Sequence, residues 1–495
     1  MRAVLWLAGA LSATAADPIE IGSRRELFVD HYLIEKLDGA SLVLHHPTAR
    51  EEAIRFDQPW EGNTSGYPTV MRDGDRFIMI YRGHRMTWEG GKLRMAHSPV
   101  VCYAESRDGI RWIKPHLRKF PLRGYLAKQV DDPLANNIVW PGSPYSGTFV
   151  PFLDTSENCP PAEKFKAVGG NRKVGLHLFT SPDAKQWQKS EEAIFKQGAL
   201  DSMNVAFWEP WTKQYVLYFR TVVDGMRSVA MATSPDLRTW SEPVPLEYPG
   251  SPRQQMYTNG IQPYHRAPHL RLGFPTRYTA RSMTDQLRSL EPVKLRADLT
   301  AAYARVGSDL TDGLFMSSRD GIRFHRWDEA FQRPGRNWMY GDNYQGYGLF
   351  ETDGGNEISM LFSEGYWREG ETRLRRYTIR PDGFVSVQAP YSGGELLTKP
   401  LVFKGRALRL NFSTSAAGSL RVEIRDAEDR PIDGYALNDC LELIGDRIDQ
   451  RVRWKNEPDV ARLAGTPVQL RFVIKDVDLY SFRFDESDHA LKLRP

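Results

Sequence analysis

The chain has 495 residues, of which 41% are hydrophobic and 12% aromatic, and its formal net charge is +4. This supply of apolar side chains is enough for several cores and excludes global disorder. The small positive excess includes no long basic run, so no nucleic-acid partner is expected, because such binding requires a concentrated basic face.

The first 16 residues predict an export signal. In MRAVLWLAGALSATAA, one arginine precedes a short apolar run, and the small residues that follow suit cleavage by signal peptidase. The alternative, a buried N-terminal helix, fits poorly because the polar stretch DPIEIGSRRE follows at once. We therefore expect a periplasmic or secreted protein. No later apolar stretch approaches the ~20 residues that a membrane span needs, so no membrane span is expected.

Residues 17–55 are predicted to form an N-terminal strand segment. They contain ELFVDHYLIEKL and SLVLHH, which are typical of strands or a turn packed against a neighbouring domain.

A repeated turn organises the next part of the chain. Each copy reads Ser-x-Asp-x-x-x-aromatic and follows a short run of alternating apolar residues. The Asp carboxylate of such a turn accepts backbone N–H bonds, and the aromatic side chain returns to the core. We expect structural roles for the four aspartates. The copies are Ser106 to Trp112, Ser181 to Trp187, Ser234 to Trp240 and Ser318 to Phe324, with Asp108, Asp183, Asp236 and Asp320 as their aspartates.

Pairs of strand-like runs lie between these turns. Examples are YPTVMRD with RFIMIYRG, and NVAFWEP with QYVLYFRT. Repeats at intervals of roughly 50 to 85 residues are typical of a β-propeller. The predicted fold is therefore all-β: a five-bladed β-propeller at residues 56–385, with a short helix only around 285–299, followed by a β-sandwich at 386–495.

Cysteine and histidine spacing predicts neither disulfides nor a metal site. Cys102, Cys159 and Cys440 are far apart in the sequence and form no CxxC pair. The pairs His45-His46 and His265/His269 lack a third ligand at metal spacing. We expect no metal and no cofactor. The sequence does not indicate an oligomeric state.

The export signal, the five sets of strands with Ser-x-Asp-Gly turns and the C-terminal sandwich resemble the five-bladed β-propeller glycoside hydrolases, such as families 32, 43, 68, 117 and 130. The resemblance implies a carbohydrate substrate bound at one mouth of the central channel. The WMNDPNG, RDP and EC motifs of family 32 are not found, so site residues must be nominated by their position on blades.

If the chain forms such a propeller, the residues that begin the first and third strands of a blade lie on the same face as the residues that end its second strand. The proposed catalytic acids are Glu61 as base or nucleophile, Asp201 as stabilising acid, and either Glu364 or Asp312 as proton donor. The predicted substrate-binding residues are Asn63, Tyr67, Arg82, Asn204, Arg220, Tyr257, Arg277 and Asp342.

Three of these residues, Arg82, Arg220 and Arg277, recur at one structural position in three blades. Either they lower the pKa values of the catalytic acids, or they bind a uronate, sulfated or otherwise acidic sugar. Each nominated acid has a structural alternative as a solvated loop residue, a turn cap or an ion-pair partner.

The predicted function is an exported glycoside hydrolase. The alternatives are a non-catalytic carbohydrate-binding propeller, a sialidase and a protein-interaction propeller. A pair of carboxyl groups facing each other across the channel mouth distinguishes the hydrolase from the binding module.

Overall fold

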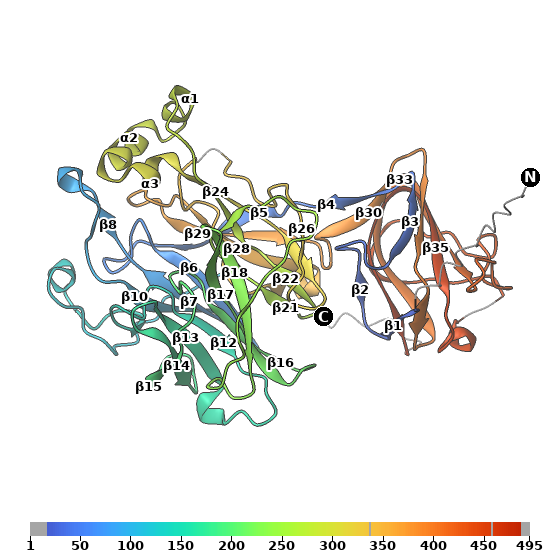
Figure 1. Ribbon diagram of the computed structural model, residues 1–495, viewed down its shortest axis with the longest axis horizontal. Helices are drawn as coiled ribbons and strands as arrows, with labels where there is room; N and C mark the ends of the chain where they lie inside the picture. Colours follow the sequence, from blue (N-terminus) through green and yellow to red (C-terminus); the bar gives the residue numbers. More distant parts are fainter. Residues whose placement is uncertain (1–16, 336–337, 457–458, 487–495) are drawn as a thin grey trace, which may run out of the picture. The chain divides into compact units, whose positions relative to one another are not determined.

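The computed structural model describes residues 17–335, 338–456 and 459–486. The predicted export signal lies outside these ranges. The described chain divides into two compact units: one lies within residues 44–384, and the other combines residues 17–43 with the described residues from 385 to 486 (Figure 1).

Three consecutive stretches of residues 44–384 each form a four-stranded antiparallel sheet, in which the strand pairs form as the sequence predicts. The first sheet contains β6 (Gly66–Asp73), β7 (Arg76–Gly83), β10 (Val100–Ser106) and β11 (Ile138–Trp140). The second contains β12 (Val150–Leu153), β13 (Phe165–Asn171), β14 (Gly175–Ser181) and β15 (Gln188–Phe195), and the third β16 (Val205–Glu209), β17 (Gln214–Val223), β18 (Met226–Ser234) and β19 (Val244–Pro245).

The next group of strands is divided into two short sheets. They contain β20 (Gln255–Met256) with β23 (Thr276–Thr279) and β24 (Leu310–Gly313), and β21 (Gln262–Tyr264) with β22 (Ala267–Gly273), β25 (Met316–Ser318) and β26 (His325–Arg326). Strands β22 and β23 are interrupted at Phe274-Pro275, because proline has no N–H to give to a ladder. The predicted helical stretch forms α1 (Asp285–Arg288), α2 (Val293–Ala302) and α3 (Ala304–Ser308), between β23 and β24 (Figure 1).

The last sheet of this unit joins distant parts of the chain. Strands β27 (Phe350–Thr352), β28 (Glu357–Glu364) and β29 (Arg373–Ile379) are followed by β5 (Thr48–Arg55), which pairs antiparallel with β29. The segment 17–55 is therefore divided between the two units and does not form one element. The reason is that β5 buries Ala53 and Ile54 in the core of the 44–384 unit.

The repeated turns have the hydrogen bonds expected of them. In each turn, one Asp oxygen accepts the backbone N–H groups of the residues two and three positions later, at 2.7–2.9 Å. The residue after the Asp has a left-handed backbone in all four copies, with φ of 73° at Gly109, 60° at Ala184, 61° at Leu237 and 79° at Gly321.

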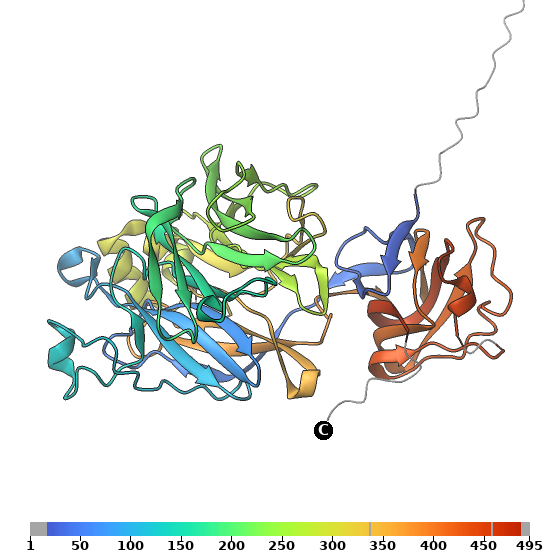
Figure 2. The ribbon, with the colours of Figure 1, turned by 90° about the horizontal axis from the view of Figure 1, so that it is seen from below.

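The other unit combines both ends of the described chain. Figure 2 shows its N-terminal strands (blue) beside the orange and red strands of the C-terminal part. An eight-stranded sheet contains β2 (Glu26–Leu27), β3 (Ile34–Asp38), β4 (Ser41–Leu44), β30 (Val385–Ala389), β31 (Gly394–Thr398), β33 (Ala407–Arg425), β34 (Asp446–Arg451) and β35 (Gln469–Asp485). A parallel pair adds β1 (Ile19–Gly22) and β32 (Leu401–Phe403), and one hydrophobic core serves the whole unit.

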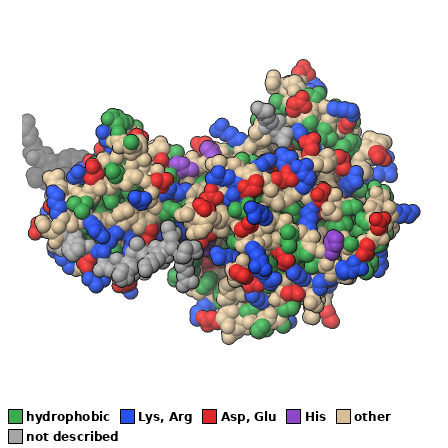
Figure 3. Space-filling model, turned by 180° about the vertical axis from the view of Figure 1, so that it is seen from behind, with side chains coloured by type: hydrophobic (Ala, Val, Ile, Leu, Met, Phe, Trp, Pro, Cys, Tyr) green, Lys and Arg blue, Asp and Glu red, His purple; other side chains and the backbone are tan. Residues whose placement is uncertain are grey.

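The surface carries mixed charge. On the face in Figure 3, basic and acidic side chains are interspersed. Among the described residues, no helix is long and apolar enough to cross a membrane. The three cysteines are free thiols, with Cys102 and Cys440 buried and Cys159 partly exposed.

Candidate functional site

Six tyrosines from five segments of the sequence meet at one place in the 44–384 unit. Tyr257 contacts three of the others. The distances from its ring centroid to those of Tyr344, Tyr278 and Tyr340 are 5.6, 6.0 and 5.7 Å. Tyr344 in turn contacts Tyr67 and Tyr366, both at 5.7 Å. We call these six residues the tyrosine cluster. Tyr278, Tyr340, Tyr344 and Tyr366 are buried, whereas Tyr67 and Tyr257 are partly exposed and are suited to stacking on the apolar face of a sugar ring.

Two of the three predicted arginines lie in the tyrosine cluster. The guanidinium carbon of Arg82 is 4.5 Å from the ring centroid of Tyr67, and that of Arg220 is 4.2 Å from Tyr257. Arg82 donates to the Thr64 carbonyl at 2.8 Å and to the Tyr366 hydroxyl at 2.9 Å. The Nε of each of these arginines is buried and has no hydrogen-bond partner among the described residues. Each therefore retains a donor for an anionic or hydroxyl-bearing ligand.

Asp342 is the most perturbed carboxyl group of the site. Its side chain is buried, and Oδ1 accepts the backbone N–H of Tyr366 at 2.8 Å. Oδ2 has no hydrogen-bond partner within the described parts of the chain. Burial raises the pKa of Asp342 to about 7, more than the Tyr366 N–H and nearby arginines lower it. The group thus holds a proton near neutral pH, as a general acid must.

Asp201 is the second carboxyl group beside the tyrosine cluster, and it differs in exposure. Its side chain is 61% exposed, and Oδ1 accepts from Arg220 at 3.0 Å. Arg220 also donates to the Tyr257 carbonyl, which fixes the guanidinium between Asp201 and the aromatic ring. The structure therefore brings together Asp201, Arg220 and Tyr257, three of the nominated residues.

The phenol of Tyr257 is electrostatically unusual. Burial favours the neutral phenol, but the charge of Arg220, a hydrogen bond with Tyr340 and the charge of Arg305 outweigh burial and lower the pKa of Tyr257 below its ordinary value. The guanidinium of Arg305 lies 5.0 Å from the ring centroid of Tyr340. The charges of Arg220 and Arg305 thus favour the ionised form of Tyr257, whereas burial raises the pKa values of the other five tyrosines.

The backbone around the tyrosine cluster is strained. Tyr67, Leu200, Asn343 and Trp367 have φ of 53°, 54°, 66° and 71°, in the left-handed region that bulky residues avoid. Tyr67 belongs to the cluster, Asn343 and Trp367 each adjoin one of its residues in the sequence, and Leu200 adjoins Asp201. Such outliers gather at functional sites, where the surrounding structure holds them.

Two nearby asparagines have different roles. Asn63 pairs its amide with both backbone groups of Met86 at 3.0 Å, and so anchors β8 (Met86–Thr87), which pairs with β9 (Arg94–Met95). This is a structural contact. Asn204 donates to the Leu200 carbonyl, whereas its Oδ1 is buried and has no partner among the described residues.

Glu61 is not presented to a ligand. Its side chain has 0% exposure and accepts from Lys114 at 2.7 Å and from the Tyr81 hydroxyl at 2.6 Å. Burial raises the pKa of Glu61 in spite of these contacts. The predicted role as base or nucleophile is therefore not carried forward, since these contacts hold Glu61 in the interior beside the first sheet.

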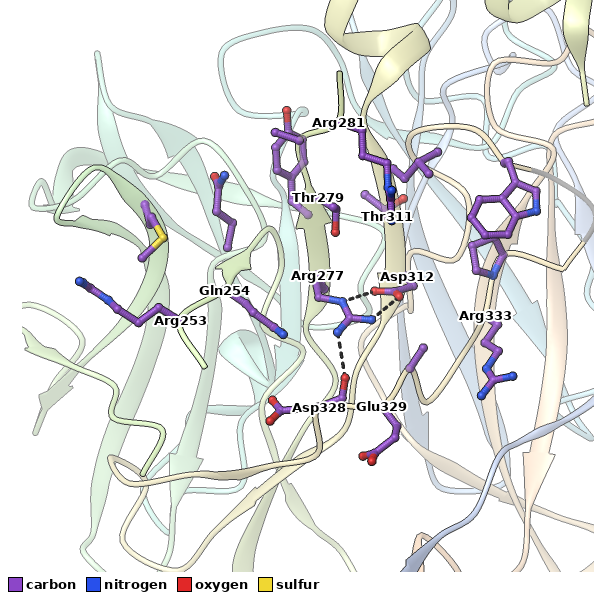
Figure 4. Close-up of a pocket in the computed structure, with 18 of the residues that line it drawn as sticks. Arg253, Gln254, Arg277, Thr279, Arg281, Thr311, Asp312, Asp328, Glu329 and Arg333 are labelled. Carbon is purple, nitrogen blue, oxygen red and sulfur yellow. Dashed lines mark hydrogen bonds and ion pairs between the residues drawn. The ribbon is translucent and has the colours of Figure 1, made fainter. Parts of the chain in front are cut away.

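The two predicted proton donors are also committed to ion pairs. Glu364 accepts from Arg373 at 2.9 Å and from Arg375 at 2.8 Å. Asp312 receives both arms of Arg277, at 2.8 and 2.5 Å, and Arg277 also donates to the Asp328 carbonyl (Figure 4). The third predicted arginine thus pairs with an acid along a separate cavity and does not join Arg82 and Arg220.

Sequence reasoning missed four members of the tyrosine cluster, namely Tyr278, Tyr340, Tyr344 and Tyr366. The available signal was local: three of the four lie within two residues of a glycine, in MYGDNYQGYG and SEGYW, at the approach to or end of a strand. The hairpin β8–β9 and helix α2 contribute Trp88, Leu93 and Leu295 to the apolar packing around them.

Comparison with known proteins gives remote structural similarity only. No family model matches the chain, and no curated protein matches it. Among solved structures, it is similar to one described as a glycoside hydrolase, with a TM-score of 0.41, 14% identity, and coverage of 68% of this chain and 93% of that one.

Two other structures match at the same level. One is from work on the GH130 family of mannoside phosphorylases, which contains glycoside hydrolases that target beta-1,2 mannosidic linkages in Candida mannan (TM-score 0.42, 15% identity, 68% of this chain and 95% of that one). The other is an N-acetylgalactosamine deacetylase from F. plautii (TM-score 0.40, 12% identity, 70% and 95%). At this level of similarity, function must be inferred from the residues of this chain.

Proposed function

We propose that the protein is a glycoside hydrolase whose substrate binds at the tyrosine cluster. The observation that carries this proposal is Asp342: a buried carboxyl group with a pKa of about 7 and an unpartnered Oδ2, beside aromatic rings and arginines. A carboxyl group that is protonated near neutral pH can protonate the leaving oxygen of a glycosidic bond.

In the proposed reaction, the proton on Asp342 passes to the glycosidic oxygen as its bond to the anomeric carbon breaks. The oxygen of a water molecule forms the new bond to the anomeric carbon, and the carboxylate of Asp201, the second carboxyl group that the reaction needs, accepts the proton of that water. The partly exposed rings of Tyr67 and Tyr257 stack on the sugar ring. Asp342 thus replaces Glu364 and Asp312 as our proposed donor.

The free Nε groups of Arg82 and Arg220 support an acidic substrate. A uronate carboxylate or a sulfate group accepts forked hydrogen bonds from guanidinium groups. The lowered pKa of Tyr257 reflects the same positive potential. We therefore propose an acidic or sulfated poly- or oligosaccharide as the substrate.

The strand pairing supports a specific architecture for this enzyme. We propose that the five groups of strands in residues 44–384 are the blades of a propeller, closed by β5, and that the other unit is a β-sandwich. We also keep export, with residues 1–16 as signal, as a proposal.

The test is product analysis on a panel of uronate-bearing, sulfated and neutral polysaccharides. Asp342→Asn and Asp201→Asn should each lower turnover by about 10²- to 10⁴-fold. Asp342→Asn should keep cleavage of aryl glycosides with good leaving groups, which need no protonation. The exposed Asp131→Asn is the control and should match wild type.

Two results would count against hydrolysis at this site. If both variants cleave a confirmed substrate at wild-type rates, these acids are not catalytic. If no substrate on the panel is cleaved, but wild type and both variants bind the same sugar equally, a non-catalytic carbohydrate-binding protein replaces the proposal.

A further inference from the structure

A cavity of about 890 Å³ lies beside the tyrosine cluster in the 44–384 unit. Its walls come from β20, β23 and β24, from residues 328–335 and from Trp338, with the Arg277–Asp312 pair at its centre (Figure 4). This volume is typical of a site for a small molecule or a few sugar rings. The proposed reaction at Asp342 and Asp201 does not use it.

Tyr278 connects the cavity to the tyrosine cluster. It lines the cavity, and its ring stacks on Tyr257 at 6.0 Å with an interplanar angle of 21°. Trp338 supplies a second aromatic wall to the cavity. Tyr278 is only 6% exposed, so its ring is a wall that the cavity shares with Tyr257.

Charged side chains of the cavity lining form ion pairs, one within the lining and two with residues outside it. Arg277 is paired with Asp312, Arg253 with Asp224, and Asp328 with Arg326. These charges are therefore compensated within the protein.

The remaining groups are available to a ligand. Arg281 and Arg333 line the cavity, and within the described residues neither forms an ion pair. The side-chain carbonyl of Gln254 is buried without a hydrogen-bond partner among the described residues. Glu329 also lines the cavity and contributes a negative charge. Two free guanidinium groups, an amide acceptor and two aromatic walls are a suitable set of contacts for a sugar ring that bears an anionic group.

We propose that this cavity is a second binding site for the same saccharide chain, and that it holds a sugar ring bearing a carboxylate or sulfate group. The inference rests on the proposed function, because Tyr278 joins the two sites. It implies that the enzyme acts on acidic oligosaccharides of several rings, which extend from the tyrosine cluster into the cavity. The contacts with Arg281 and Arg333 select the charge, and Tyr278 and Trp338 hold the ring.

Binding to an array of acidic oligosaccharides tests the proposal without requiring turnover. The array carries uronate-bearing and sulfate-bearing chains of two to six rings, each with its neutral counterpart. Wild type should retain acidic chains of three or more rings, and the two acidic arms distinguish carboxylate from sulfate. The double variant Arg281→Ala/Arg333→Ala should weaken retention of these chains at least about tenfold, and Trp338→Ala should weaken it as well.

Matched controls separate the cavity from general effects of charge or aromatic loss. Arg288→Ala removes an exposed arginine of the neighbouring helix α1, and Trp211→Ala removes an exposed tryptophan in the turn between β16 and β17. Both should bind like wild type. Unchanged retention in the double variant, or preference of wild type for the neutral chains, would overturn the proposal.

The hydrolase proposal fails in a different way. Asp342→Asn should retain acidic chains like wild type, because it leaves the cavity intact. Loss of cleavage in Asp342→Asn together with intact retention supports both proposals. Full cleavage in Asp342→Asn refutes only the catalytic assignment, whereas normal retention in the double variant refutes only the second binding site.

Discussion

At the scale of single residues, burial and ion pairing together decide which acid keeps its proton near neutral pH. Asp201, Asp312 and Glu364 all pair with arginines, whereas Oδ2 of Asp342 has no partner among the described residues. A buried carboxyl group without a cationic partner keeps its proton, because ionisation would leave a desolvated charge. This is the property that separates Asp342 from the other acids of the site.

This property makes folding stability depend on pH. The pKa of Asp342 is raised from 3.8 to about 7, so its contribution is fully present below pH 3.8 and is lost as the pH rises through about 7. Three pKa units correspond to about 4 kcal/mol. We expect the free energy of unfolding of wild type to fall by that order between pH 4 and pH 8, relative to Asp342→Asn.

Urea unfolding at pH 4, 6 and 8 measures this difference, with Asp131→Asn as the control that should parallel wild type. If the stabilities of wild type and Asp342→Asn run parallel across this range, the carboxyl group titrates normally.

The sequence predicted which of these residues lie together in some cases, but it did not show how buried or paired the others are. Position at strand ends was enough to group Asp201 with Arg220. It failed for Glu61, because Lys114 lies 53 residues away in the sequence and only the folded first sheet brings the two together. Asp342 was assigned only a binding role, because Asp-Asn is ordinary turn chemistry, and nothing local shows that Tyr366 and its neighbours bury it.

At the scale of elements, the repeated turn is the feature that the sequence predicted best. Its contacts are local, so spacing alone determines them: the acceptor and both donors lie within four residues. Pairing of each strand with its sequence neighbour followed from the same locality. The closing strand β5 did not, because its partner β29 lies more than 300 residues away.

Loss of one turn carboxylate should destabilise the fold measurably. Asp183 accepts two backbone N–H groups at 2.8 Å and the Ser181 hydroxyl at 3.1 Å. We expect Asp183→Ala to lower the free energy of unfolding by about 1–2 kcal/mol, and Asp183→Asn, which retains one acceptor oxygen, to lower it less.

The effect of Asp183 should depend on pH in the direction opposite to that of Asp342. Burial raises the pKa of Asp183, but the backbone hydrogen bonds and Ser181 outweigh burial and lower it below 3.8. The stabilisation is therefore present above pH 3.8 and is lost as the pH falls below it. Glu191→Ala, an exposed change in β15 of the same sheet, is the control. Equal stability of Asp183→Ala and Glu191→Ala would show that the turn contributes nothing.

At the scale of the whole molecule, the chain forms two units with separate hydrophobic cores, and one unit is inserted in the sequence of the other. The unit of residues 44–384 is continuous in sequence, whereas its neighbour is assembled from both ends. The predicted boundary at residue 56 followed the first repeat-like strand pair. It missed β5 because a single short strand gives no sign, in the sequence, of the sheet that it joins.

The contribution of β5 can be tested by comparing two fragments. Residues 44–384 include β5 and should fold cooperatively, whereas residues 56–384 lack it. The shorter fragment leaves β29 as an open edge and removes Ala53 and Ile54 from the core, so we expect it to melt at lower temperature and to aggregate. Circular dichroism melts and size-exclusion chromatography measure both effects. The double variant Ala53→Asp/Ile54→Asp in the longer fragment should reproduce the defect, because it keeps the chain length but removes the packing. Equal melting of the two fragments would show that the last sheet is complete without β5, and the start of the unit would then return to residue 56.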